Sequence, residues 1–139
     1  MRQSLALPDR TALLLIDLQE EQRHDPLYKA FGIEAVLGNA ARLLDAARDA
    51  QRLVIHAAYR RDYSTHPPRP FEPVGPDGKA VFSDAASPMT EICPEVAPLR
   101  SETVIYKNDA SAFGEGDLAR RLDADEIEWL VIAGVWTEA

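Results

Sequence analysis

Two charged side chains of opposite sign follow apolar stretches of the sequence, and together they could carry out acid–base chemistry. Asp17 comes directly after ALLLI, and Lys107 comes directly after TVIY. A carboxylate at the end of a buried strand loses part of its solvation, which raises its pKa and makes it a better proton acceptor. Asp17 could instead cap the following turn. An Asp–Lys pair could be either a structural ion pair or a catalytic couple.

A third feature lies in VIAGVWTEA, residues 131–139. Gly134 permits a tight turn, and Thr137-Glu138-Ala139 resembles the start of a helix. A helix N-terminus offers free backbone N–H groups and the positive end of the helix dipole. A thiol placed there would have a lowered pKa and would act as a thiolate. The sequence ends at Ala139, where such a residue would follow.

The elements that must position these groups are four short apolar runs with strand character. Their apolar residues are nearly continuous, which is typical of strands covered on both faces. The runs are Thr11–Ile16, Arg52–Ala57, Thr103–Tyr106 and Trp129–Ala133. Apolar residues at three-and-four spacing predict a helix from Ile33 to Ala50, and a shorter helix is expected from Gly116-Asp117.

This order of elements predicts an α/β fold with a mostly parallel sheet. Right-handed crossovers place the carboxyl ends of all strands at one edge, where open α/β sheets bind ligands. Asp17 and Lys107 are therefore expected at the same edge. The proline-rich span from Arg60 to Glu91 should form no regular structure. A loop of this length is a lid, a binding loop, an interface arm or an inert crossover.

Composition restricts the class of protein. The chain has 139 residues, a net charge of −8 and 46% hydrophobic residues, which predicts one soluble, cytoplasmic domain. No cluster of basic residues favours nucleic acid, no apolar run could span a membrane, and the N-terminus does not resemble a signal peptide. The single cysteine, Cys93, excludes an internal disulfide and a cysteine-cage zinc site. Cys93 lies far from any strand end, so we expect a semi-buried thiol, and His56 is expected in the core.

Taken together, these segments resemble the isochorismatase-like cysteine hydrolase superfamily, whose members include nicotinamidases and N-carbamoylsarcosine amidohydrolases. The resemblance depends on LLLIDLQ (13–19), KNDASAFGEGDL (107–118) and VIAGVWTEA (131–139), in this order, with PEVAPLRSETVIYK (94–107) as a further similar stretch. It implies a three-layer Rossmann-like sandwich with strand order 3-2-1-4-5-6, no cofactor, a small-molecule substrate and a homo-oligomer. The family has two further strands after this point, and WLVIA would otherwise be an uncovered apolar edge. Residues 1–139 are therefore interpreted as a single domain truncated at its C-terminus.

The resemblance also implies roles for individual residues. Asp17 would be the general base, and Lys107 would stabilise the thiolate and the tetrahedral intermediate. The nucleophilic cysteine would come directly after Ala139, and the Trp136–Thr137 peptide bond would be the family's cis bond beside the oxyanion. The residues expected to line the substrate pocket are Gln19, Gln22, Tyr59 and Phe113, and Arg60 and Arg61 could line the same crevice. Gln22 stands where many relatives have an aromatic residue, which disfavours a flat aromatic substrate.

The expected activity is cysteine-dependent hydrolysis of a small amide or carbamoyl C–N bond through an acyl-enzyme. The alternatives are hydrolysis of an isochorismate-type vinyl ether and an inactive family member that serves as a scaffold. Metal-binding nicotinamidases carry Asp-x-His after the second strand, but here Ser64 takes the histidine position. No metal is predicted, although Asp62 and His66 leave one possible. A phospho-receiver domain and a DxD phosphatase are disfavoured because Asp17 has no acidic neighbour and Gln19 replaces the second aspartate.

Overall fold

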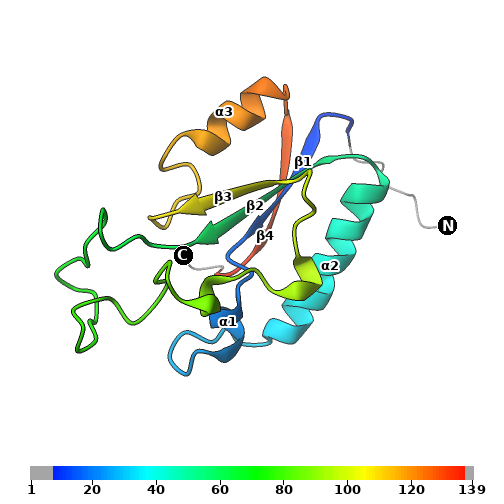
Figure 1. Ribbon diagram of the computed structural model, residues 1–139. Coiled ribbons are helices and arrows are strands. Elements are labelled where there is room, and N and C mark those ends of the chain that lie inside the picture. Colours follow the sequence, from blue (N-terminus) through cyan, green and yellow to red (C-terminus); the bar gives the residue numbers. More distant parts are fainter. Residues whose placement is uncertain (1–7, 137–139) are drawn as a thin grey trace.

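A parallel sheet forms the centre of the computed structural model, which describes residues 8–136. The strands are β1 (Thr11–Ile16), β2 (Leu53–Tyr59), β3 (Thr103–Lys107) and β4 (Trp129–Gly134), in the spatial order β3-β2-β1-β4 (Figure 1). All paired strands run parallel. The order agrees with the first four strands of the predicted topology.

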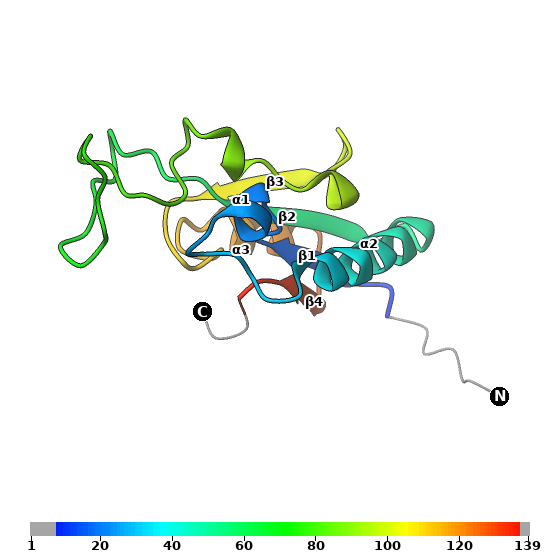
Figure 2. The ribbon, with the colours of Figure 1, turned by 90° about the horizontal axis from the view of Figure 1, so that it is seen from below.

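Helices cover the two faces of the sheet (Figure 1, Figure 2). Successive side chains of a strand point to opposite faces, so one buried strand supplies apolar groups to both. Leu13 and Leu15 of β1 pack in the same core cluster as α2 (Ile33–Asp49), whereas Leu14 packs in a second cluster with Leu118 of α3 (Asp117–Ala124). The layers are therefore helix, sheet and helix, as predicted.

Three short elements were not expected from the periodicity of the sequence. The helix α1 (Glu20–His24) has the polar sequence EEQRH, and the 3-10 helices η1 (Pro88–Thr90) and η2 (Pro94–Val96) each begin with proline. Elements this short carry no measurable hydrophobic period. They matter because α1 directly follows β1 and lies under the carboxyl edge of the sheet (Figure 1).

The segment between β2 and β3 projects beyond the carboxyl edge of the sheet (Figure 1, Figure 2). The span predicted to be irregular, residues 60–91, contains no helix or strand up to residue 87, and the 3-10 helix η1 at residues 88–90 is the exception. The buried guanidinium of Arg61 holds the start of this segment together: it donates to the carbonyl oxygens of His66 and Pro67 at 3.1 and 2.7 Å and pairs with Glu72. Polar contacts within the segment thus hold its first part in place.

A second buried network lies on the α2 side of the sheet. His56 of β2 is buried and its Nε2 lies 3.1 Å from Oε2 of Glu102, whose carboxylate also receives two hydrogen bonds from Arg48. Burial lowers the pKa of His56. The prediction that His56 is a satisfied core residue is confirmed. No helix within residues 8–136 has the length and apolar character needed to cross a membrane.

Candidate active site

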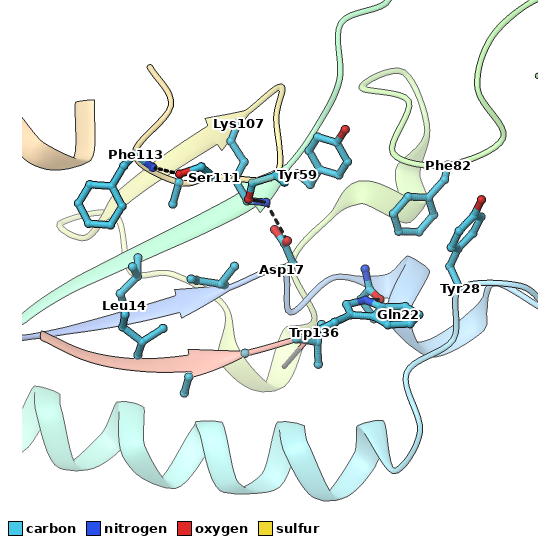
Figure 3. Close-up of a pocket in the computed structure, with 17 residues that line it drawn as sticks. Leu14, Asp17, Gln22, Tyr28, Tyr59, Phe82, Lys107, Ser111, Phe113 and Trp136 are labelled. Atoms are coloured by element: carbon cyan, nitrogen blue, oxygen red, sulfur yellow. Dashed lines mark hydrogen bonds and ion pairs between the residues drawn. The ribbon is translucent and has the colours of Figure 1, made fainter. Parts of the chain in front are cut away.

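Asp17 and Lys107 meet at the carboxyl edge of the sheet, as the sequence predicts. Lys107 is the last residue of β3 and Asp17 follows the last residue of β1, and both ends lie beside β2. Nζ of Lys107 lies 2.8 Å from Oδ2 of Asp17 (Figure 3). The two side chains are 4% and 15% exposed, so the ion pair is largely removed from water.

The two oxygens of the Asp17 carboxylate have different surroundings: one is paired with Lys107, and within residues 8–136 the other has no hydrogen-bond partner. Its backbone has φ of 53°, in the left-handed region, and its N–H donates to the carbonyl oxygen of Ala57. Oδ1 is buried and has no hydrogen-bond partner among the described residues. Burial raises the pKa of Asp17, although the neighbouring charge of Lys107 opposes this. A desolvated carboxylate with a free oxygen is suited to accept a proton.

Lys107 is fixed from several sides. Besides Asp17, its ammonium donates to the carbonyl oxygen of Ala110 at 3.0 Å and lies 4.8 Å from the centre of the Tyr59 ring. An ammonium placed in this way provides a positive charge in a site of low dielectric, where it can stabilise a nearby anion.

The ion pair opens into a cavity of about 740 Å³. Apolar and aromatic side chains make up most of its wall, and Figure 3 shows Tyr28 and Phe82 facing each other on the side away from the sheet. Their ring centres lie 4.3 Å apart. A concave, mainly apolar cavity with a few polar groups is the usual form of a small-molecule site.

Three of the four predicted pocket residues line this cavity, and the fourth does not. Gln22, Tyr59 and Phe113 are part of the wall. Gln19 is buried outside it, and its amide is used by the backbone: Nε2 donates to the carbonyl oxygens of Tyr59 and Thr90, and Oε1 accepts the N–H of Tyr59. Gln19 therefore joins the end of β2 to η1. Its place in the opening motif predicted proximity to the site, but only the tertiary structure showed that its polar atoms are already paired.

The arginines after β2 also lie outside the cavity. Arg61 is used by Glu72 and by backbone carbonyls, and Arg60 donates to the carbonyl oxygen of Ala85 and lies over the Tyr106 ring. Alternation along the extended backbone turns Arg60 away from the side of Tyr59. Arg61 is instead held by Glu72 and by the backbone of the following loop.

The end of β4 forms the wall opposite Lys107. Trp136 lines the cavity, and the described cis peptide bond joins Val135 to Trp136. This is one residue earlier than predicted. Neither bond precedes a proline, so the sequence carries no local signal for the position. Thr137 and the Trp136–Thr137 bond lie outside the described residues.

Gly134 is required by the close approach of β4 to β1. Its φ is 146°, and a Cβ atom there would overlap the carbonyl oxygen of Ile16, the residue before Asp17. The absence of a side chain thus lets the turn after β4 reach the site.

Several cavity residues were not identified from the sequence. Tyr28 follows α1, Phe82 lies in the proline-rich segment, and Ser111 follows Lys107. Their aromatic character within irregular segments was the available signal for Tyr28 and Phe82. Glu21 was also missed: it is buried, its Oε2 accepts the N–H of Ser83 at 2.7 Å, and burial raises its pKa to about 7. It links α1 to the segment that carries Phe82.

The alternative nucleophile, Cys93, and the possible metal ligands, Asp62 and His66, do not form a reactive centre. Cys93 is fully buried in the α2-side core, and burial raises the pKa of its thiol to about 12, so it is an unreactive core residue. Oδ1 of Asp62 accepts hydrogen bonds from the N–H and hydroxyl of Ser64, and Nδ1 of His66 lies 2.8 Å from the Thr65 hydroxyl. Between residues 8 and 136, no three His, Cys, Asp or Glu side chains are grouped as metal ligands.

Comparisons with known proteins identify relatives of this chain. The chain is 34% identical over 141 residues to maleamate amidohydrolase from Pseudomonas putida, a match that covers 97% of this chain and 63% of the relative. The chain thus spans less than two thirds of that protein's length.

Solved structures agree as well. An isochorismatase from Pseudomonas putida has 28% identity and a TM-score of 0.74, and the match covers 94% of this chain and 58% of that one. N-carbamoylsarcosine amidase from Thermoplasma acidophilum has 20% identity and a TM-score of 0.71, covering 89% of this chain and 66% of that one, which shows a shared fold. The family model described as the isochorismatase domain matches residues 11–139. Because this match extends over nearly the whole sequence and includes both members of the Asp17–Lys107 pair, the chain belongs to the isochorismatase domain family.

Proposed function

We propose that this chain provides the acid–base part of a cysteine hydrolase that cleaves a small amide or carbamoyl C–N bond. The observation that carries the proposal is the buried Asp17–Lys107 ion pair in the wall of a cavity of small-molecule size, in which Oδ1 of Asp17 has no hydrogen-bond partner among the described residues. The name of the maleamate amidohydrolase relative, an enzyme that hydrolyses an amide, supports the same class of reaction.

The proposed reaction has two steps. In the first, Asp17 takes the proton of a cysteine thiol, the thiolate attacks the carbonyl carbon, and the tetrahedral oxyanion collapses to a thioester. The C–N bond breaks and the leaving nitrogen takes the proton from Asp17. In the second, Asp17 accepts a proton from water as it attacks the thioester, and the thiol regains that proton as the acid is released. Lys107 stabilises the negative charge throughout.

The nucleophile is proposed from the family resemblance to be a cysteine directly after Ala139. The turn after β4 is consistent with this position, because Trp136 lies on the cavity wall beside Gln22 (Figure 3). Thr137, which lies outside the described residues, keeps its proposed place in the oxyanion site.

The vinyl-ether alternative is supported by the burial of the Asp17 carboxyl group, 15% exposed, which raises its pKa. A protonated carboxyl group could protonate the vinyl carbon, after which water adds to the oxocarbenium carbon and the hemiketal collapses to a ketone and an alcohol. This reaction needs no cysteine.

The experiment is an assay of the intact natural protein with a panel of primary amides, following ammonia release, and with isochorismate, following pyruvate release. Alkylation with iodoacetamide at low pH should abolish ammonia release, with one equivalent of label on a cysteine other than Cys93. Pyruvate release that survives alkylation would establish the vinyl-ether reaction instead. Labelling confined to Cys93 after unfolding, with neither product formed, would indicate an inactive scaffold and contradict the proposal.

A further inference from the structure

The amide group of Gln22 is fixed in one orientation by Trp136. Gln22 lies in α1 and is 2% exposed, and Nε1 of Trp136 lies 2.6 Å from its Oε1. An indole N–H is only a donor, so the Gln22 oxygen must face the indole. The amide nitrogen therefore has to point in the other direction.

That direction is the cavity. Figure 3 shows the amide nitrogen of Gln22 directed toward the space bounded by Asp17, Tyr59 and Phe82. Within residues 8–136 no acceptor pairs with this nitrogen. The nitrogen is not completely enclosed by protein atoms, and because Gln22 lines the cavity, we infer that its exposed part faces that cavity. Gln19, three residues earlier, contrasts with it, because all of its amide is used by the backbone.

The charges around the cavity determine which acceptor fits. Lys107 is the one cation among the described residues that line it, and its charge is already paired with Asp17. Arg60 and Arg61 lie outside the wall. A carboxylate at the Gln22 end would lose its solvation, and the described residues of the wall offer it no unpaired cation, so its burial is costly. A neutral carbonyl oxygen loses less and needs only the N–H donor.

We propose that Gln22, oriented by Trp136, determines specificity by donating a hydrogen bond to a neutral carbonyl oxygen at the end of the substrate remote from the scissile amide. The inference rests on the proposed amide hydrolysis. It assigns the substrate class as small neutral amides with a second carbonyl group, such as diamides, with the intervening carbons against the apolar wall.

The test compares three series of primary amides of equal chain length in the intact protein. The diamides malonamide to adipamide carry a neutral carbonyl, the corresponding monoacid monoamides carry a carboxylate, and the unbranched monoamides carry neither. At the best chain length, we expect kcat/KM for the diamide to exceed both others by at least about tenfold. Preference for the monoacid, or equal rates for diamide and monoamide, would overturn the inference.

Variants assign this preference to the Gln22–Trp136 pair. Gln22→Leu should reduce the diamide-to-monoamide ratio to about one, and Trp136→Phe should reduce it in part because the amide can then rotate. Gln22→Glu replaces the donor with an acceptor and serves as the second test if Gln22→Leu does not fold. The matched control is Asn39→Leu, which replaces an exposed amide of α2 outside the cavity and should retain the wild-type ratio. An unchanged ratio in folded Gln22→Leu would overturn the inference.

Failure of the proposed function would be distinguishable. If the wild-type protein hydrolyses no amide, the same compounds are tested as ligands by saturation-transfer NMR. Stronger binding of the diamides to the wild type than to Gln22→Leu would support the recognition role without catalysis. Equal binding of diamide and monoamide to the wild type would contradict it.

Discussion

At the scale of single residues, the two carboxylate oxygens of Asp17 have different roles in the site. Oδ2 holds Lys107 and Oδ1 is unpaired. Pairing prevents the ammonium from being buried without a partner, while the unpaired oxygen keeps the carboxylate available for a proton. A buried ion pair contributes little to stability as such. Its position at the wall of a cavity is therefore better explained by chemistry than by folding.

Asp17→Asn should lower kcat by about 10²–10⁴-fold because the amide cannot accept the proton. The fold should survive, since Lys107 keeps the carbonyl oxygen of Ala110 as an acceptor. Steady-state kinetics and a thermal melt check both points. The matched control is Asp49→Asn on the exposed face of α2, which should change neither. Turnover of the Asp17→Asn variant at the wild-type rate would show that Asp17 is not the general base.

Cys93→Ser should lower the free energy of unfolding by about 1–3 kcal/mol, because a hydroxyl group replaces a thiol in an apolar cluster. Activity should remain within about twofold of wild type. Chemical denaturation and kinetics measure the two effects, and Cys93→Ala separates the cost of the hydroxyl group from the loss of volume. Loss of activity in a folded Cys93 variant would mean that the nucleophile has been wrongly assigned.

At the scale of elements, the parallel register brings distant chain segments to one edge. Ile16 is in register with both Ala57 of β2 and Gly134 of β4, and Tyr59 is in register with Lys107. Each strand thus ends within one or two residues of its neighbour, and the side chains that follow must meet. A shift of register by one residue would turn Lys107 away from Asp17.

Gly134→Ala should destabilise the carboxyl edge of the sheet. The new Cβ would overlap the Ile16 carbonyl, so β4 or β1 must move, and we expect a loss of about 2–4 kcal/mol in stability together with most of the activity. Gly38 of α2 is the control, because a Cβ there meets nothing within 4 Å. Gly38→Ala should stabilise the protein by up to about 1 kcal/mol. Unfolding curves that rank the two variants in the opposite order would contradict the packing argument.

At the scale of the whole molecule, two buried carboxyl groups give stability opposite dependences on pH. Burial raises the pKa of Glu21 to about 7, so the folded state holds its proton more tightly than the unfolded chain does. Its contribution to stability falls as pH rises from about 4.5 to about 7. For Glu102, burial is outweighed by the hydrogen bonds from Arg48, Leu99 and His56, and the pKa falls to about 2. Its contribution is present above about pH 4.5 and is lost as pH falls toward 2.

Glu21→Gln should therefore be more stable than wild type at pH 8 and similar to it at pH 4.5. The amide oxygen can still accept the Ser83 N–H, and no charge is buried. Glu102→Gln should have a lower free energy of unfolding than wild type above about pH 4.5, and this difference should disappear as pH falls toward 2. Denaturant unfolding at several pH values measures both differences. A Glu21→Gln effect that does not change between pH 4.5 and 8 would contradict the assignment.

Oligomeric state and cellular compartment remain predictions at this scale. Trp129 and Ile132 of β4 are 59% and 58% exposed, and in the described part of the chain β4 pairs with β1 alone. Light scattering of the intact protein would measure its molar mass.

The sequence by itself determined the strands, α2 and α3, the parallel sheet and the convergence of Asp17 with Lys107. These follow from local apolar runs, from the helical period and from the rule that parallel strands end at one edge. Only the tertiary structure decided that the Gln19 amide bonds to the backbone while Gln22 faces the cavity. It also decided that Arg60 and Arg61 have partners outside the cavity. Tyr28 and Phe82 were likewise found in the cavity wall only from the structure. The physical reason is that these outcomes depend on which polar atoms find partners across loops. The partners of Gln19 and Gln22 lie 40 to 114 residues away in sequence, and no periodicity of the sequence predicts such pairings.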